Sequence, residues 1–104
     1  MYARVTLLEI DTLRIGVDEA VALFKGQVLP DLQAQEGLEG VAVLATTEGK
    51  GMIVTLWATE EGAWDSAGFG STELERYMTL FRAPPGREHY AVAFADLPGG
   101  VLVG

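Results

Sequence analysis

Apolar and polar positions follow two different periods along the chain, and each period predicts a type of element. From Ala3 to Ile10 the residues are mostly β-branched or aliphatic, and Arg4 and Thr6 face opposite to Val5 and Leu7 if successive side chains alternate. This alternation predicts a first strand over Ala3 to Ile10.

A helical period follows from Asp18 to about Gln35. Four apolar residues recur there at spacings of three and four, namely Val21, Phe24, Val28 and Leu32. Pro30 lies inside this segment and cannot donate a hydrogen bond to the carbonyl of Gly26. We therefore predict a long helix that is kinked or divided near Pro30 and ends before Gly37 and Gly40.

The segment from Val41 to Trp57 contains two apolar runs joined by a turn at residues 48–50, which predicts a β-hairpin. In the second run both faces are apolar: Met52, Val54 and Leu56 alternate with Ile53, Thr55 and Trp57. A strand of this kind is usually covered on both sides. Since so short a chain forms few helices, we expect the second cover to be another subunit.

A second helical zone and a last strand complete the pattern. Thr59 begins the zone, residues 68–70 (Gly-Phe-Gly) should interrupt it, and Thr72 stands three residues before Glu75, the spacing of a capping box. An apolar stripe then runs to about Arg82, formed by Leu74, Tyr77, Met78 and Phe81. His89 to Asp96 is predicted as a strand with Tyr90, Val92 and Phe94 on one face and alanines on the other, and Val101 to Val103 as a short tail strand.

The predicted order is β, α, β, β, α, β, the split βαβ pattern of a ferredoxin-like α+β domain. We expect one domain over residues 1–104, with an antiparallel sheet and its helices on one face.

Composition narrows the function classes. Fifteen acidic and seven basic residues give a formal charge of −8, which disfavours nucleic acid and anionic membranes as partners. The chain has no cysteine, no apolar run of the roughly 18 residues that a membrane span requires, and no secretion-like start, so we expect a cytoplasmic protein. Its 49% hydrophobic content also favours an oligomer.

Two segments carry a family resemblance: residues 28–41 (VLPDLQAQEGLEGV) and residues 54–63 (VTLWATEEGA). They resemble the antibiotic-biosynthesis monooxygenase type of dimeric α/β barrel, and the resemblance extends over nearly the whole chain. It implies a homodimer in which two sheets pack face to face, and a pocket between each sheet and its helices. The family includes cofactor-free oxygenases of quinol-like aromatics, haem-degrading enzymes and members of unknown activity.

The resemblance also suggests residues of the pocket. Trp57 matches the family Trp at the end of the third strand and would form a pocket wall or stack on an aromatic substrate. Five further residues belong to the segment that roofs the pocket in related proteins: Trp64, Phe69, Tyr77, Met78 and Phe81. For all of them the alternative is an ordinary place in the core.

His89 is the only imidazole and therefore the only side chain whose usual pKa suits proton transfer near neutral pH. Arg87 could hold an anionic or enolate oxygen, and Tyr77 or Tyr90 could donate a hydrogen bond to it. The alternative for His89 is a solvated strand end.

Some family features are missing. The chain has no Asn, which some oxygenase and haem-degrading members use to orient substrate, and residues 65–82 contain no His to serve as the haem ligand of the haem-degrading branch. We therefore expect no haem, no other cofactor and no metal. No nucleotide-binding or hydrolase motif is present either.

Two function classes remain open. One is a cofactor-independent monooxygenase acting on a small aromatic or polyketide-like substrate, and the other is a non-catalytic homodimer that binds a small hydrophobic ligand or is purely structural. An open cavity with His89 or Tyr77 on its lining would favour the enzyme, whereas a space filled by the chain's own side chains would favour the second class.

Overall fold

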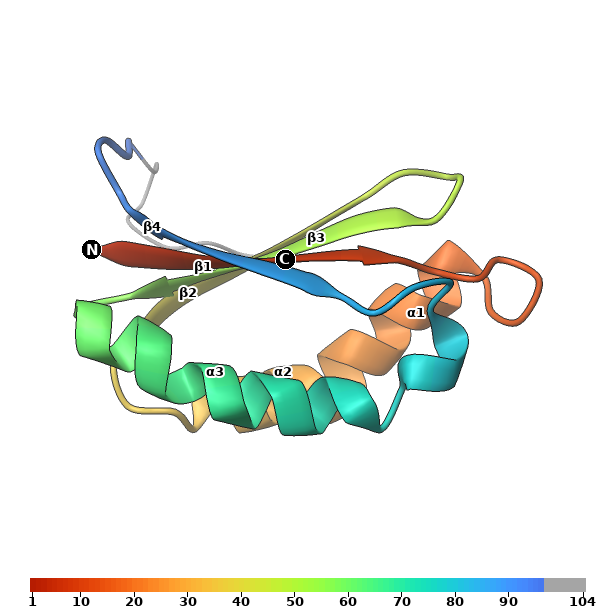
Figure 1. Ribbon diagram of the computed structural model, residues 1–104, viewed down its shortest axis with the longest axis horizontal. Coiled ribbons are helices and arrows are strands. Elements are labelled where there is room, and N and C mark those ends of the chain that lie inside the picture. Colours follow the sequence, from red (N-terminus) through yellow and green to blue (C-terminus); the bar gives the residue numbers. More distant parts are fainter. Residues whose placement is uncertain (97–104) are drawn as a thin grey trace.

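The computed structural model describes residues 1–96, with only the backbone course for residues 67–71. The elements in order are β1 (Tyr2–Glu9), α1 (Val17–Leu23), the π-helical η1 (Phe24–Val28), α2 (Leu29–Gln33), β2 (Leu38–Ala45), β3 (Lys50–Trp57), α3 (Glu60–Glu75), the 3₁₀ turn η2 (Met78–Leu80) and β4 (Gly86–Ala91). The four strands form one antiparallel sheet in the order β2-β3-β1-β4. All helices lie on one face of this sheet (Figure 1). The predicted ferredoxin-like α+β fold is confirmed.

The first helix is divided, as its Pro30 predicts. Regular α-helix ends at Leu23, five residues follow in π-helical form, and α2 begins at Leu29 with Pro30 in its first turn. Proline suits a first turn because the N–H that it lacks would have no helical partner there. Gly37 then adopts a φ of 84°, a left-handed conformation that favours glycine, and leads into β2.

The prediction of a helix broken at residues 68–70 is wrong. α3 runs without interruption from Glu60 to Glu75, and Thr72 lies within it rather than capping a second helix. The predicted start is correct, since the Thr59 side chain accepts a hydrogen bond from the Gly62 N–H at 3.0 Å. Two glycines cost a helix roughly 2 kcal/mol, which packing of its length against the sheet can offset.

The last strand lies earlier than predicted. β4 covers Gly86–Ala91 instead of residues 89–96, so His89 stands within the strand and not at its head. Its length follows from its partner: Ala91 pairs with Tyr2 at the start of β1, and only one more hydrogen bond, from Val92 N to Met1 O, follows. The predicted tail strand, residues 101–103, falls outside the described residues.

The two faces of the sheet differ in their cover. The face toward the helices carries Ile53, Thr55 and Trp57 of β3, and the last two of these are buried. The opposite face, which we call the open face, carries the apolar side chains of Val5, Leu7, Ala42, Leu44, Met52 and Val54 together with Tyr90. Leu7, Leu44 and Tyr90 are exposed there. The second cover expected for β3 is therefore not supplied by the described part of this chain.

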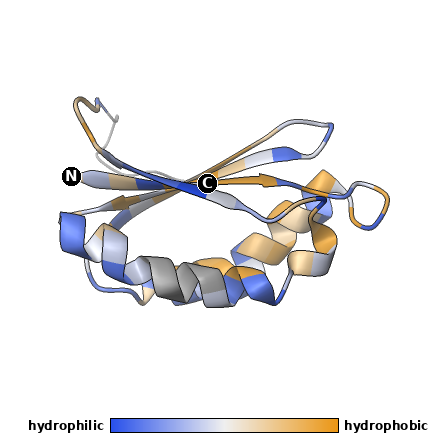
Figure 2. Cartoon of the chain, in the orientation of Figure 1, coloured by the Kyte–Doolittle hydropathy of each residue, from blue (hydrophilic) through white to orange (hydrophobic). Residues whose placement is uncertain are grey.

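Hydrophobic residues of the helical layer gather on α1, whereas the first turns of α3 are hydrophilic (Figure 2). No helix in the described part of the chain combines the length and apolar character that crossing a membrane would require.

Candidate functional site

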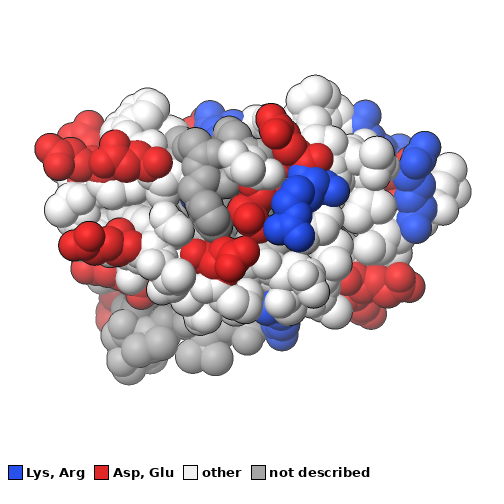
Figure 3. All heavy atoms as spheres, turned by 90° about the horizontal axis from the view of Figure 1, so that it is seen from below, with Lys and Arg blue, Asp and Glu red and all other residues white. Residues whose placement is uncertain are grey.

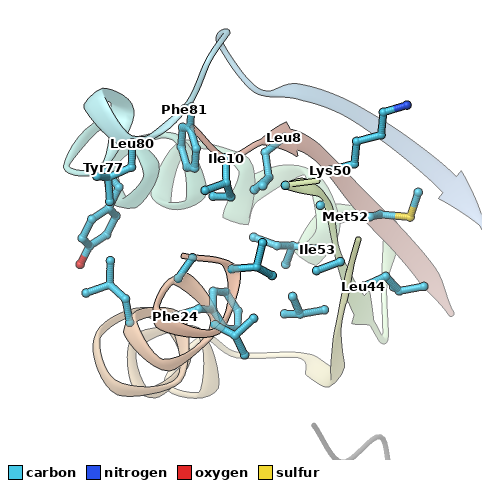
Figure 4. Close-up of a pocket in the computed structure, with 18 of the residues that line it drawn as sticks. Leu8, Ile10, Phe24, Leu44, Lys50, Met52, Ile53, Tyr77, Leu80 and Phe81 are labelled. Carbon is cyan, nitrogen blue, oxygen red and sulfur yellow. The ribbon is translucent and has the colours of Figure 1, made fainter. Parts of the chain in front are cut away.

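An apolar pocket lies between the helical layer and the sheet. Its walls come from β1, β2, β3, α1, η1, the end of α3 and the segment around η2, and side chains such as Ile10, Phe24 and Ile53 point into it (Figure 4). The cavity has a volume of about 80 Å³, and about 670 Å³ when the gaps between its side chains and the open solvent at its mouth are included. Small-molecule pockets usually measure roughly 300 to 1,000 Å³. The pocket can thus take a small apolar group as it stands, and a larger ligand requires its side chains to move.

Two of the predicted site residues line this pocket. Tyr77 stands at the end away from Leu44 and Met52, and Phe81 closes one side, where it pairs with Ile10 in an isolated antiparallel bridge (Figure 4). Tyr77 is the lining residue that brings a phenolic hydroxyl, and the rest of the lining is almost wholly apolar.

A polar row crosses the sheet beside the pocket, beneath α3. The strand register places Thr55, Arg4 and His89 side by side on β3, β1 and β4, all on the face toward the helices. The next row holds Ile53, Thr6 and Arg87 in the same order. Ile53 is also a wall of the apolar pocket, so the pocket and the polar row adjoin across β1.

Arg4 is the most unusual member of this row. It is only 3% exposed, and its Nη1 donates to Ser66 Oγ of α3 at 2.5 Å. Ser66 in turn donates to the Ala63 carbonyl at 3.1 Å. Burial, with a smaller effect of the nearby Arg87 cation, lowers the pKa of Arg4 to about 10. Within residues 1–96, no carboxylate with a described side chain forms an ion pair with Arg4.

His89 lies against α3. Its ring stacks on the ring of Trp64 with centroids 3.8 Å apart and an angle of 12° between the planes. Its Nε2 atom is buried and forms no hydrogen bond with any described residue. Trp64 itself is more than half exposed, so the stack lies at the protein surface on its outer side.

Trp57 is completely buried and is not among the residues that line the apolar pocket. Its Nε1 donates to Thr55 Oγ1 at 2.9 Å, and the Arg4 guanidinium lies over its ring, 5.4 Å from the centroid. These contacts place Trp57 in the core beneath the polar row.

The predicted site residues thus fall into two neighbouring groups. Tyr77 and Phe81 belong to the pocket, whereas His89 belongs to the polar row, Arg87 to the row next to it, and Trp64 covers His89. Met78 begins η2 and is 36% exposed, outside the pocket lining. The Phe69 side chain falls outside the described residues. Whether any of these residues contacts a substrate stays a prediction.

Sequence reasoning did not select Arg4, Thr6, Thr55 or Ser66 as site residues. The sequence feature that could have indicated two of them is the alternation of side chains along β1, which places Arg4 and Thr6 on the face opposite to the apolar residues of that strand. Polar residues on one face of a strand usually indicate solvent. Here that face turns toward α3, so its polar groups are buried instead.

The polar row contains the Arg4 cation, whereas the surface of the helical layer above it carries many acidic side chains. Acidic side chains are spread over the helical face of the protein, with few basic ones among them (Figure 3). Glu73 of α3 is a buried carboxylate, but its Oε2 pairs with Arg76 of the same helix at 3.5 Å. Among the described residues no group of three acidic, His or Cys side chains could hold a metal ion.

Comparison with known proteins supports the fold. No protein-family model matches the sequence, and no curated protein is significantly similar to it. Solved structures do match: a protein of unknown function from Nitrosomonas europaea is 22% identical with a TM-score of 0.74, covering 93% of both chains.

Two other matches indicate what this fold is used for elsewhere. A monooxygenase from the ActVA-Orf6 gene of Streptomyces coelicolor, solved with nanaomycin D, is 19% identical with a TM-score of 0.68, covering 93% of this chain and 91% of its own. A dimeric ferredoxin-like protein from an uncultured marine organism is 11% identical with a TM-score of 0.64, covering 93% and 99%. Further matches are antibiotic-biosynthesis monooxygenase-like structures. The chain therefore shares the ferredoxin-like fold of these proteins, and the fold that the resemblance implied is confirmed.

Proposed function

We propose that this chain is a cytoplasmic, cofactor-independent enzyme of the monooxygenase type that acts on a small aromatic or polyketide-like substrate. The observation that carries the proposal is the apolar pocket, with the Tyr77 phenol on its lining and with His89 and Arg87 of β4 in the two rows beside it. An apolar cavity with a few polar groups at its margin is the usual form of a small-molecule site.

The residues suggest a division of roles. His89 would accept a proton from a substrate methylene next to an aromatic ring through its Nε2, which is buried and forms no hydrogen bond with a described residue. Arg87 or Tyr77 would stabilise the negative charge on the substrate oxygen. Dioxygen would then convert the methylene to a carbonyl: one oxygen atom remains in the product, and the other leaves as water with both methylene hydrogens.

Oxygen uptake tests this proposal. Anthrone, an enolisable three-ring ketone, should consume one dioxygen per molecule and yield anthraquinone faster with the protein than without it, in the presence of a metal chelator. His89→Gln should lose most of the acceleration, whereas Arg14→Gln, at an exposed loop position, should retain it. A rate equal to spontaneous oxidation would count against the enzyme.

The second candidate is a non-catalytic binder of small hydrophobic molecules. The cavity volume of about 80 Å³ favours a small ligand or a purely structural homodimer over a polycyclic substrate, because the pocket's own side chains occupy much of the space that a substrate would need. Saturable binding of an aromatic compound with no oxygen uptake would support this alternative.

We also propose that the chain forms a homodimer through the open face of its sheet. Exposed Leu7, Leu44 and Tyr90 lie on one side of an otherwise well-covered sheet, and an apolar patch of this kind usually marks an interface. The dimeric ferredoxin-like protein from the marine organism has the same fold, which supports a pairing of this type.

A further inference from the structure

Two cations lie close together beneath α3: Arg4 is buried and Arg87 is half-buried. Arg4 and His89 are opposite residues of β1 and β4, and Arg87 lies two residues before His89, so both arginines project from the same face of neighbouring strands. Diagonal neighbours of this kind are roughly 7–8 Å apart at the backbone, within reach of long side chains. The Arg87 charge is close enough to lower the pKa of Arg4.

Burying a cation without a partner is costly, and proteins normally provide a carboxylate. A guanidinium carries five N–H donors. Among the described residues Ser66 provides the one side-chain acceptor for Arg4, and no carboxylate lies within 4 Å of it. This is notable in a chain with more than twice as many acidic as basic residues. Glu73 of α3 is a buried carboxylate, but it pairs with Arg76.

Other groups around the pair suit an anion as well. His89 Nε2 is buried with no hydrogen bond to a described residue, and an imidazole nitrogen can donate to an oxygen when it carries a proton. The Thr6 hydroxyl is buried in the same row as Arg87, whereas the Thr55 hydroxyl already donates to the Arg4 carbonyl and accepts from Trp57 Nε1. The site therefore gathers positive charge and hydrogen-bond donors in a place of low dielectric, where a charge-assisted bond is strong.

The apolar pocket adjoins this group. Ile53 forms part of the pocket wall and stands opposite Thr6, which in turn stands opposite Arg87. Two strand spacings of about 4.8 Å separate β3 from β4. Rings in the pocket would thus leave an attached acidic group near the arginines.

We propose that Arg4 and Arg87 bind the carboxylate of an aromatic acid whose rings occupy the apolar pocket. The proposal rests on the proposed small-molecule function and specifies its ligand class. A guanidinium matches a carboxylate because its planar N–H groups can bond both oxygens at once. The ligand's charge would also supply the countercharge that Arg4 lacks among the described residues.

Affinities for a matched pair of probes test the inference. 2-Naphthoate and 2-naphthamide have the same rings and nearly the same shape, and only the first is charged. Calorimetric titration of the full chain should give naphthoate at least a tenfold lower Kd than the amide. Arg4→Met and Arg87→Met should each remove most of that ratio and leave the amide affinity within about twofold. Arg4→Lys should retain part of it, and Arg82→Met, which alters an exposed arginine, should retain all of it.

The amide serves as an internal measure of folding, because a variant that still binds it has an intact pocket. Equal affinities in the unaltered protein, or a ratio that survives both Arg4→Met and Arg87→Met, would overturn the inference and leave the proposed small-molecule function standing. Failure of both probes to bind saturably would overturn the two together.

Discussion

Trp57 connects the polar row to the core. It is fully buried, its indole N–H is bonded to Thr55, and Arg4 lies over its ring. A guanidinium over an indole face is attracted by the ring's negative quadrupole, by about 2 kcal/mol when the pair is desolvated. Substituting a residue with so many buried contacts is expected to change the free energy of unfolding more than the affinity for a ligand.

We therefore expect Trp57→Phe to destabilise the protein by about 1–3 kcal/mol through the void it leaves and the lost hydrogen bond to Thr55. The change should not alter the affinity for 2-naphthamide. Chemical denaturation gives the first quantity and calorimetry the second. In a Trp64→Phe background, which leaves one indole, Trp57 emission should be blue-shifted and inaccessible to small quenchers; a ready quenching with little loss of stability would instead support a pocket wall.

For individual residues, the sequence indicated which side of a strand a side chain faces and what chemistry it offers, but not which groups would surround it. The strand alternation correctly separated Arg4 and Thr6 from the apolar side of β1. It could not tell that α3 would cover the polar side, because that depends on a helix some 60 residues away in the chain. His89 was likewise identified by its chemistry, while its stacking on Trp64 required the fold.

The connections that lead into β2 and β3 each contain a glycine in a left-handed conformation, Gly37 and Gly49. Gly49, in the β2–β3 turn, has a φ of 99°, and its carbonyl accepts a hydrogen bond from Ile10 N at 2.7 Å. A Cβ at Gly49 would lie 2.6 Å from the Ile10 carbonyl oxygen, which belongs to the backbone and cannot move easily. Gly37 has a similar φ of 84°, but nothing lies within 4 Å of its Cβ position.

These two glycines form a matched pair of substitutions. Gly37→Ala should cost about 1–2 kcal/mol, the strain of a left-handed conformation in a residue with a side chain. Gly49→Ala carries the same strain and also the overlap with Ile10, so we expect a total loss of about 3 kcal/mol or more. Thermal and urea unfolding of both variants would measure the difference, and equal losses would show that the turn can move away from β1.

Elements were predicted well where local chemistry decides them and poorly where tertiary contacts do. Pro30 divides the first helix, and α3 starts at Thr59, both as predicted from the local sequence. The Gly-Phe-Gly segment looked like a break because glycine disfavours helix. The continuous helix shows that the sheet surface outweighs that preference. β4 is shorter than its apolar pattern suggested since a strand extends only as far as its partner allows.

In the whole molecule, the open face of the sheet is an apolar surface that no described residue covers. Its centre is apolar, through Met52, Val54 and Leu44. Its edge on β4 is polar: the Tyr90 hydroxyl donates to Glu88 at 2.6 Å, and this hydrogen bond raises the pKa of Tyr90. An apolar centre with a polar rim is the usual arrangement of a protein interface.

We expect the protein to be a stable dimer at micromolar concentration, with a mass twice its 11.1 kDa and an interface that buries more than about 2,000 Å² in total. Leu44→Glu should convert it to a monomer, since the new charge would be buried against the partner sheet without a countercharge. Leu44 is 53% exposed in the single chain, so the substitution should leave the fold of the subunit intact. Leu13→Glu is the matched control, because Leu13 is 91% exposed in a loop away from the sheet.

Light scattering coupled to size exclusion distinguishes these cases. If the dimer forms through the open face, the Leu44→Glu protein elutes at the subunit mass with an unchanged circular dichroism spectrum, while Leu13→Glu remains dimeric. If the unaltered protein is a monomer, the dimer prediction is wrong and the open face remains exposed to solvent. A dimer that survives Leu44→Glu would place the interface elsewhere.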